Sequence, residues 1–225
     1  MPGNKFYSKV YAAQDEVLKL VQDEHVDFYL TGGTALSRGY LNHRYSDDLD
    51  FFINKALDFK LQVERVVGAF RKAGLEFDTG TVSESFIRMT IRKGQISVKV
   101  DFVNDVEYHY GEFKTADFFN KIDSWRNILS NKLCAISRLE PKDVADILFT
   151  SKNFQFYWPE IIEEAKEKDL WVDPLEVCRL LNSFKINLFD TVKWAFSVDK
   201  AKLARELVQM HDDIFYGKGN TLLNG

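Results

Sequence analysis

Cysteine is scarce in this chain: among 225 residues there are two, Cys134 and Cys178, and neither belongs to a C-x-x-C motif. This scarcity excludes a zinc-finger type of site and a disulfide framework, and it predicts two ordinary buried thiols. No apolar run is long enough to span a bilayer, and residues 1–5 show none of the apolar character of a signal peptide. We therefore expect a cytoplasmic protein with no membrane partner.

A dominant charge is also lacking. Lysine and arginine number 30 against 34 aspartates and glutamates, so the formal net charge is −4 and the pI is about 5.7. This balance excludes adhesion to nucleic acid through bulk positive charge, so any polynucleotide contact must come from a local basic patch. The composition is 45% hydrophobic and 14% aromatic, which at this length supports a core and one or two domains.

The two halves of the chain differ in their periodicity. The first alternates expected helices (residues 8–24, 34–41 and 59–73) with expected strands (27–31, 48–53, 86–92 and 96–103), the last two forming a hairpin. After about residue 115, strand signals nearly vanish and helical periodicity continues to about residue 216, followed by an end that we expect to fray. The pattern predicts an α+β fold, with an α/β core and mixed sheet over residues 1–113 and a helical domain over 114–225.

Asp48 and Asp50 are the first candidates for chemistry. In a strand, side chains two residues apart point to the same face, so these carboxylates stand side by side while Leu49 and Phe51 turn into the core. Adjacent carboxylates repel each other unless a cation lies between them. Oxygen ligands suit Mg²⁺ or Mn²⁺, and such a metal site points to phosphate chemistry.

A third acid and a glycine turn extend this pattern. Asp101 lies on the second arm of the hairpin, and with Asp48 and Asp50 it forms a candidate triad for one or two metal ions. Upstream, Gly32-Gly33 allows backbone N–H groups to approach a phosphate, and the hydroxyls of Thr34 and Ser46 are further candidates for nucleotide binding. Each feature alone is more often structural, because Gly-Gly and Asp-Asp are common in turns. Their order along the chain is the specific signal.

This order of motifs resembles the AbiEii/AbiGii toxin family, within the DNA polymerase β-like nucleotidyltransferases. The resemblance covers most of residues 28–150, and it is carried by four segments: Gly32-Gly33-Thr34-Ala35-Leu36, Arg44-Tyr45-Ser46-Asp47-Asp48-Leu49-Asp50-Phe51-Phe52, Asn131-Lys132-Leu133 and Arg138-Leu139-Glu140-Pro141-Lys142-Asp143-Val144-Ala145-Asp146.

The resemblance implies roles for particular residues. Metal ligands would be Asp48, Asp50 and Asp101, and Lys132 would neutralise the nucleotide's phosphates. Asp143 or Asp146 would orient Lys132 or the acceptor, and which of the two is essential stays open. On periodicity alone, Lys132 fits a solvated helix face equally well. The implied catalytic residues are Asp48, Asp50, Asp101, Lys132, Asp143 and Asp146, and the implied nucleotide-binding residues are Gly32, Gly33, Thr34, Ser46 and Arg44.

The implied activity is transfer of a nucleoside monophosphate (NMP) from a nucleoside triphosphate (NTP) to an acceptor hydroxyl, with release of pyrophosphate. We expect the site in the cleft between the two domains, a tRNA or a protein as acceptor, and a cognate antitoxin as partner, as in a type IV toxin–antitoxin system. Two alternatives are a small-molecule nucleotidyltransferase of the aminoglycoside-modifying type and a catalytically inactive nucleotide-binding interaction module. Retention of three acids and Lys132 argues against the inactive module.

Overall fold

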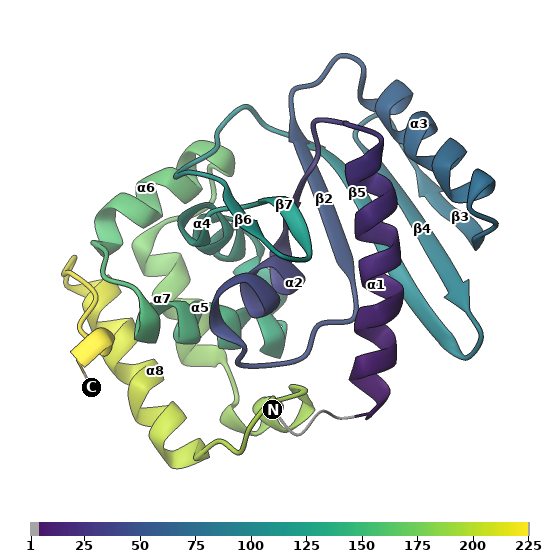
Figure 1. Cartoon of the computed structure of the whole chain (residues 1–225). Helices are drawn as coiled ribbons and strands as arrows, with labels where there is room; N and C mark the ends of the chain where they lie inside the picture. Colours follow the sequence, from purple (N-terminus) through teal and green to yellow (C-terminus); the bar gives the residue numbers. More distant parts are fainter. Residues whose placement is uncertain (1–4, 225) are drawn as a thin grey trace. The chain divides into compact units, whose positions relative to one another are not determined.

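A computed structural model describes residues 5–224, which divide into two compact units (Figure 1). Unit 1 comprises residues 5–35, 46–107 and 112–123, and unit 2 comprises residues 36–45, 108–111 and 124–224. This division differs from the predicted boundary after residue 113, and residues 108–111, which were expected in the first domain, belong to unit 2. Two further differences concern longer segments. Residues 114–123 belong to unit 1 because they add strands to its sheet, and the segment 36–45, early in the sequence, belongs to unit 2.

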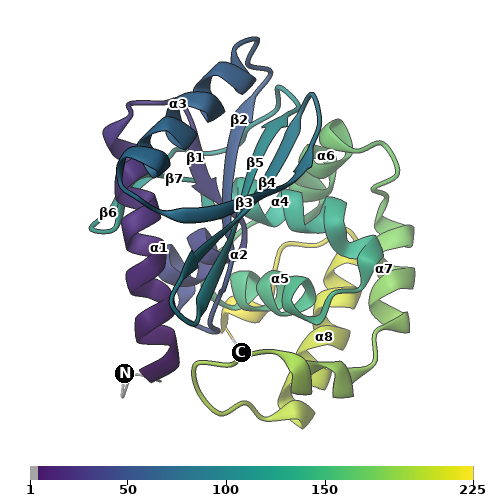
Figure 2. The same ribbon diagram turned by 90° about the vertical axis from the view of Figure 1, so that its right-hand side faces the viewer.

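Unit 1 is a mixed sheet with α1 and α3 against one of its faces (Figures 1 and 2). The strand order is β3-β4-β5-β2-β1-β7-β6; the pairs β2–β5 and β1–β7 are parallel, and the other neighbours are antiparallel. The elements are α1 (Lys5–Asp23), β1 (Tyr29–Thr31), α2 (Gly32–Leu36), β2 (Leu49–Asn54), α3 (Phe59–Lys72), β3 (Glu76–Val82), β4 (Phe86–Lys93), β5 (Ile96–Asp105), β6 (Lys114–Ala116) and β7 (Phe119–Ile122).

The alternation predicted for the central strands is confirmed. Leu49 and Phe51 of β2 are fully buried, and so are Val100 and Phe102 of β5. The Phe51 and Phe102 rings stack with their centroids 5.4 Å apart. The opposite side chains of these strands therefore point to the other face of the sheet, which carries the predicted acids.

Three strands were not expected. The prediction that strand signals vanish after residue 115 is wrong for β6 and β7, which have three and four residues and are too short to show a period. β3 was missed because it is an edge strand whose side chains are mostly exposed, so it lacks the alternation of a half-buried strand. Backbone pairing with β4 forms it.

Unit 2 is helical, and helix α5 lies at its centre among α4, α8 and the 3₁₀ turns η3 and η4 (Figure 2). The prolines at 141, 159 and 174 fall in the first turns of three helices, where proline is readily accommodated. The elements are the π-helical turn η1 (Ser37–Leu41), α4 (Trp125–Ala135), η2 (Ile136–Arg138), α5 (Pro141–Asn153), α6 (Trp158–Lys168), α7 (Pro174–Ser183), η3 (Ile186–Thr191), α8 (Lys200–Phe215) and η4 (Leu222–Asn224).

The C-terminal segment is not frayed between residues 217 and 224. Asn220 is buried, and its Nδ2 donates to the carbonyls of Ser151 (2.6 Å) and Phe154 (2.8 Å), which anchors the segment to α5. Gly225 lies outside the described residues. Among residues 5–224, no helix combines the length and apolarity needed to cross a membrane. Both cysteines are free thiols; Cys178 is buried as expected and Cys134 is partly exposed.

Candidate active site

Neighbouring strands of unit 1 place three acids together on the sheet face opposite α1 and α3. Asp50 of β2 pairs in register with Asp101 of β5 on one side and with Thr31 of β1 on the other. Asp48 comes one residue before β2 and shares the side of Asp50, as the two-residue period requires. We call Asp48, Asp50 and Asp101 the acid row.

Arg88 of β4 lies directly across from Asp101, and its guanidinium group (the fork) forms a bidentate ion pair with the Asp101 carboxylate. Its Nε donates to Oδ1 at 2.8 Å and its Nη2 donates to Oδ2 at 2.7 Å, and the Asp101 side chain is 8% exposed. The hydrogen bond to Asp101, with the negative charges of Asp48 and Asp50, raises the pKa of Arg88 further above its usual range. This guanidinium is therefore a permanent cation of the acid row.

Lys99 is the second cation of the acid row. Its Nζ lies 2.7 Å from Oδ2 of Asp48 and 4.0 Å from Oδ2 of Asp101. Lys99 therefore pairs chiefly with Asp48. Arg88 was not predicted at all, although the short turn between β4 and β5 fixes the register that sets it opposite Asp101.

The residues present fit a divalent ion at Asp48 and Asp50. Three carboxylates and two cations leave the acid row with one negative charge, and oxygen donors are those that Mg²⁺ and Mn²⁺ prefer. The two side-chain cations already drawn to the row show that it attracts positive charge. Within residues 5–224, however, no three acidic, histidine or cysteine side chains are arranged to hold one ion, so the predicted three-acid set is not assembled here.

Gly32 makes room for Asp50. It adopts φ +66°, and a Cβ at this position would lie 2.3 Å from Oδ2 of Asp50. The position of Asp50 therefore depends on a glycine at residue 32, because any side chain there would strain the backbone and displace the Asp50 carboxylate.

We expect Gly32→Ala to lower nucleotidyl transfer at least about tenfold, because the displaced carboxylate loses its productive position. The matched control is Gly74→Ala, since Gly74 has a similar φ of +72° and no atom within 4 Å of the added Cβ. Both variants should lose about 1–2 kcal/mol of stability in chemical denaturation, from the left-handed backbone alone. Equal activity in the two variants would contradict the proposed contact between Gly32 and Asp50.

The two residues predicted to bind nucleotide through their hydroxyls, Thr34 and Ser46, are buried near the acids in hydrogen-bonded positions. Thr34 is buried, and its hydroxyl donates to the backbone carbonyl of Asp48. Ser46 is also buried; its carbonyl accepts from Nε2 of Gln14 at 3.0 Å. These bonds fix the loop that carries Asp48. A role for either hydroxyl, or for Gly33, in binding nucleotide stays a prediction.

Unit 2 brings Lys132 together with two predicted acids. Nζ of Lys132, on α4, lies 2.5 Å from Oδ1 of Asp143 and 2.8 Å from Oδ2 of Asp146, both on α5. The three-residue spacing of the acids places them on one side of α5. The Lys132 side chain is 12% exposed and both acids are almost fully buried, so the reading of Lys132 as a solvated surface residue is wrong.

Asp146 is also the partner of two residues from the distant segment 36–45. Arg44 donates to it twice, from Nε to Oδ1 and from Nη2 to Oδ2, both at 2.7 Å. The ring of His43 contacts Oδ1 at 2.9 Å through Nε2. Backbone bonds from Ala195 and Tyr45 hold this segment in place within unit 2. We call His43, Arg44, Lys132, Asp143 and Asp146 the buried ion cluster.

Arg44 was predicted to bind nucleotide. Its side chain is 5% exposed and its guanidinium fork is occupied by Asp146, so the geometry favours a structural contact instead. No regular spacing links residues 44 and 146, and this pairing has no signal in the sequence.

The cluster shifts the proton affinity of its members. Burial alone would raise the pKa of Asp146, but Arg44 and Lys132 hold it well below the usual range. Burial would likewise lower the pKa of Lys132, but Asp146 and Asp143 raise it above the usual value. Burial lowers the pKa of His43, against the opposing effect of Asp146, and its Nδ1 is buried with no partner among the described residues. Asp146 and Lys132 are thus charged within the cluster, as is Arg44, and the imidazole of His43 is neutral.

We expect the free energy of unfolding to fall as the pH is lowered from about 7.5 to about 5.5, across the ordinary histidine pKa. The folded-state pKa of His43 is lowered, so the unfolded chain takes up the proton first; stability is full above the unfolded pKa and declines below it. Asp146 does not contribute in this window because its pKa lies far lower. Urea unfolding of the wild type and of His43→Asn would check this, since the variant should show a shallower decline. Parallel declines would contradict it.

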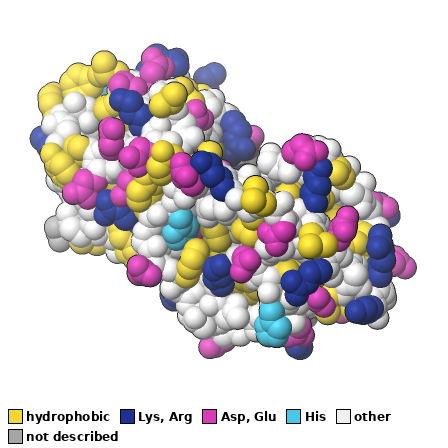
Figure 3. All heavy atoms as spheres, turned by 90° about the horizontal axis from the view of Figure 1, so that it is seen from above, with side chains coloured by type: hydrophobic (Ala, Val, Ile, Leu, Met, Phe, Trp, Pro, Cys, Tyr) yellow, Lys and Arg dark blue, Asp and Glu magenta, His cyan; other side chains and the backbone are white. Residues whose placement is uncertain are grey.

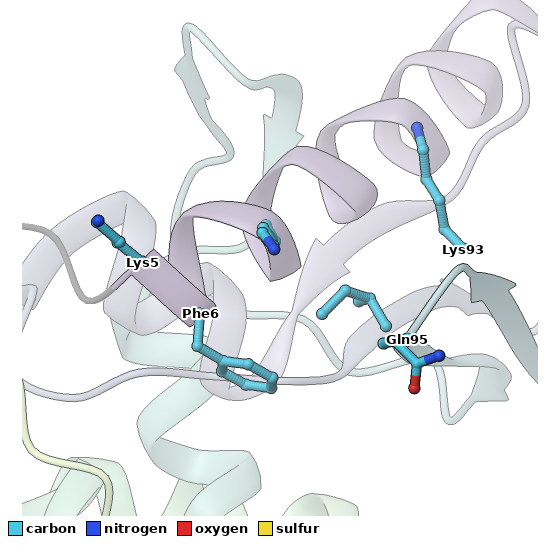
Figure 4. A pocket seen from close by; sticks show the side chains of 6 residues that line it. Lys5, Phe6, Lys93 and Gln95 are labelled. Carbon is cyan, nitrogen blue, oxygen red and sulfur yellow. The ribbon is translucent and has the colours of Figure 1, made fainter.

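A lysine-lined hollow of about 500 Å³ lies in unit 1 between the start of α1 and the β4–β5 turn (Figure 4). The exposed Phe6 ring forms part of it. On the face drawn in Figure 3, positive and negative side chains are interspersed and no broad basic field forms. The hollow is lined by Lys5, Phe6, Lys9, Lys93, Gln95 and Ile96.

Comparison with known families decides the identity of this fold. The profile described as "Nucleotidyl transferase AbiEii toxin, Type IV TA system" matches residues 19–207. The chain belongs to the AbiEii nucleotidyltransferase family. The resemblance predicted from its motifs is thereby confirmed, and the match extends beyond the motifs into the helices of unit 2.

Solved structures agree with the AbiEii fold. A Helicobacter pylori protein assigned as a nucleotidyltransferase has 20% identity and a TM-score of 0.65, covering 95% of this chain and 96% of its own. JHP933 from Helicobacter pylori has 21% identity and a TM-score of 0.65, covering 95% of this chain and 93% of its own. At these identities the likeness concerns the fold. A search of curated proteins finds no significant match.

Proposed function

We propose that this AbiEii-family nucleotidyltransferase is a metal-dependent toxin that moves NMP from an NTP to a hydroxyl at an RNA end. The observation that carries the proposal is the acid row, where Asp48 and Asp50 share one face of the sheet beside the left-handed turn at Gly32. Type IV family membership supports an antitoxin as its partner in the cell.

In this proposal Asp48 and Asp50 hold a divalent ion with the triphosphate. The bound ion would offset phosphate charge and polarise the attacking hydroxyl. The hydroxyl loses its proton to solvent as its oxygen forms a bond to the α-phosphorus. The bond from the α-phosphorus to the oxygen that bridges to the β-phosphate breaks, and pyrophosphate leaves with that electron pair. Lys99 is a further phosphate ligand, because it can exchange its single contact with Asp48 for a phosphate oxygen.

The buried ion cluster has a positioning role in this scheme. Lys132 provides the cation for the nucleotide's phosphates, and Asp143 and Asp146 orient its ammonium group through the 2.5 Å and 2.8 Å contacts. Arg44 holds Asp146, and in this scheme it acts on Lys132 through that carboxylate. Of the two acids, Asp146 is the better candidate for the essential one, because three basic side chains converge on it.

An RNA acceptor is favoured over a protein by the lysine-lined hollow. An exposed aromatic ring in a hollow that lysines help to line suits a stacked base with its phosphates. Two contacts connect the elements of the hollow with the acid motif. Tyr7 is next to Phe6, and its hydroxyl donates to Asp47 at 2.9 Å. Lys99, which pairs with Asp48, lies on β5, the same strand as Ile96 of the hollow.

We expect the double variant Lys5→Glu/Lys9→Glu to reduce transfer to RNA at least about tenfold, because reversed charges repel the phosphates. Binding of Mg²⁺ and NTP, measured by calorimetry, should stay within about twofold, since neither lysine belongs to the acid row. Lys19→Glu, elsewhere on α1, controls for a general change of charge. Unchanged RNA transfer in the double variant would exclude the hollow as the acceptor surface.

The test of the function itself is a label-transfer screen. The wild-type protein is incubated with Mg²⁺, each α-labelled NTP in turn, and total tRNA, cell protein or small-molecule acceptors including aminoglycosides. The proposal predicts label in the RNA fraction with at least one NTP. Label confined to protein or to an aminoglycoside would assign a different acceptor, and no label in any fraction would favour the inactive binding module.

A further inference from the structure

The contact between Arg88 and Asp101 is unlike the other contacts of the acid row. Both carboxylate oxygens of Asp101 accept from the fork, at 2.8 Å and 2.7 Å, and the carboxylate is 8% exposed. A divalent ion on either oxygen would lie at close range to a permanent cation. Like charges at such range repel, so the fork and a metal ion compete for Asp101.

Two features position Arg88, whose side chain is 42% exposed. Its strand pairs in register with β5, which places residue 88 directly across from residue 101. The ring of Phe86, two residues earlier on the same face, lies 5.1 Å from Cζ of Arg88 and adds a cation–π contact. The raised pKa of Arg88 agrees with a cation that the row stabilises.

Lys99 and Asp48 contrast with this arrangement. The contact is a single one of 2.7 Å, and the two side chains are 33% and 28% exposed. A lysine on a flexible stem exchanges such a contact easily, whereas a planar fork on a buried carboxylate does not. The Asp48 carboxylate can thus exchange its cation for a metal ion more easily than the Asp101 carboxylate can.

We propose that Arg88 takes the place of one of the two metal ions expected in a three-acid site. Its ion pair with Asp101 keeps this carboxylate from binding a metal, and the acid row binds a single divalent ion through Asp48 and Asp50. The guanidinium supplies fixed positive charge where the other ion would lie. This inference rests on the proposed function, because it concerns the metal-binding side chains of the same site.

Counting bound Mn²⁺ tests the inference without measuring activity. Mn²⁺ is titrated into each protein with a non-hydrolysable α,β-methylene NTP, and electron paramagnetic resonance reports the free ion. We expect one bound Mn²⁺ for the wild type and one for Asp101→Asn. Arg88→Met frees Asp101, so we expect two. The matched control is Arg92→Met, which removes another arginine of β4 that pairs with Asp78 and not with the acid row, and it should bind one.

Two bound Mn²⁺ in the wild type, or a lower count in Asp101→Asn than in the wild type, would overturn the inference and leave the proposed function standing. One bound Mn²⁺ in a correctly folded Arg88→Met would also overturn it. If circular dichroism shows that Arg88→Met does not fold, the Mn²⁺ counts of the wild type and of Asp101→Asn still test the inference. No bound Mn²⁺ in the wild type would instead contradict the metal–nucleotide site of the proposed function.

Discussion

Asp50→Asn should lower the rate of NMP transfer by about three orders of magnitude while leaving the fold intact, because it removes a preorganised charge at the reacting phosphate. Asp50 lies centrally in the sheet, paired with Thr31 on one side and Asp101 on the other. The amide has the size of the carboxylate, so the packing of Leu49 and Phe51 behind it is unchanged. Initial rates of label transfer at saturating NTP would measure the loss.

The matched control is Asp47→Asn, which removes an acid from the same segment. Asp47 accepts a hydrogen bond from Tyr7 at 2.9 Å and is not a member of the acid row. We expect this variant to keep more than about a third of the wild-type rate, because the two-residue period turns residue 47 away from the side that carries Asp48 and Asp50. If Asp50→Asn kept as much activity as Asp47→Asn, the metal assignment would be wrong.

Asp146→Asn should destabilise the protein by about 3–5 kcal/mol, since it leaves buried cations without their counter-charge. The Asp146 side chain is fully buried, and it contacts Arg44, Lys132 and His43. An asparagine offers one oxygen where the carboxylate offers two. For a chain of this size the loss corresponds to a fall in melting temperature of about 10 °C. Differential scanning calorimetry at neutral pH would measure it.

An exposed ion pair of unit 2 supplies the control. Glu176 pairs with Arg179 at 2.7 Å, and the two side chains are 48% and 65% exposed. Glu176→Gln should therefore cost less than about 1 kcal/mol. Adding Arg44→Met to Asp146→Asn should cost less than the sum of the single variants, because the two residues share one contact. Equal, small losses in Asp146→Asn and Glu176→Gln would contradict the account of the cluster.

The acid pair could be predicted because its signal is local. Asp48 and Asp50 alternate with Leu49 and Phe51, so a single period places the acids on one face and buries the others. The hairpin that carries Asp101 was predictable for the same reason. These elements are determined by residues close together in the sequence. The order of the motifs along the chain also indicated the protein family.

The contacts of the buried ion cluster could not be predicted in the same way. Arg44 and Asp146 are separated by 102 positions, and their pairing depends on how segment 36–45 packs into unit 2. The side of α5 that carries Asp143 and Asp146 is buried, whereas amphipathic periodicity favours a polar side in solvent. Strands β6 and β7 form because neighbouring strands supply their hydrogen bonds, and this too is a tertiary effect.

The most direct test of the central claim compares two labels on one substrate. The wild-type protein is incubated with Mg²⁺, the preferred acceptor and NTP labelled at either the α- or the γ-phosphate. The account predicts that α-label is transferred to the acceptor and that γ-label appears in pyrophosphate, with neither seen in Asp50→Asn. Transfer of γ-label to the acceptor, or α-label transfer that survives in Asp50→Asn, would contradict it.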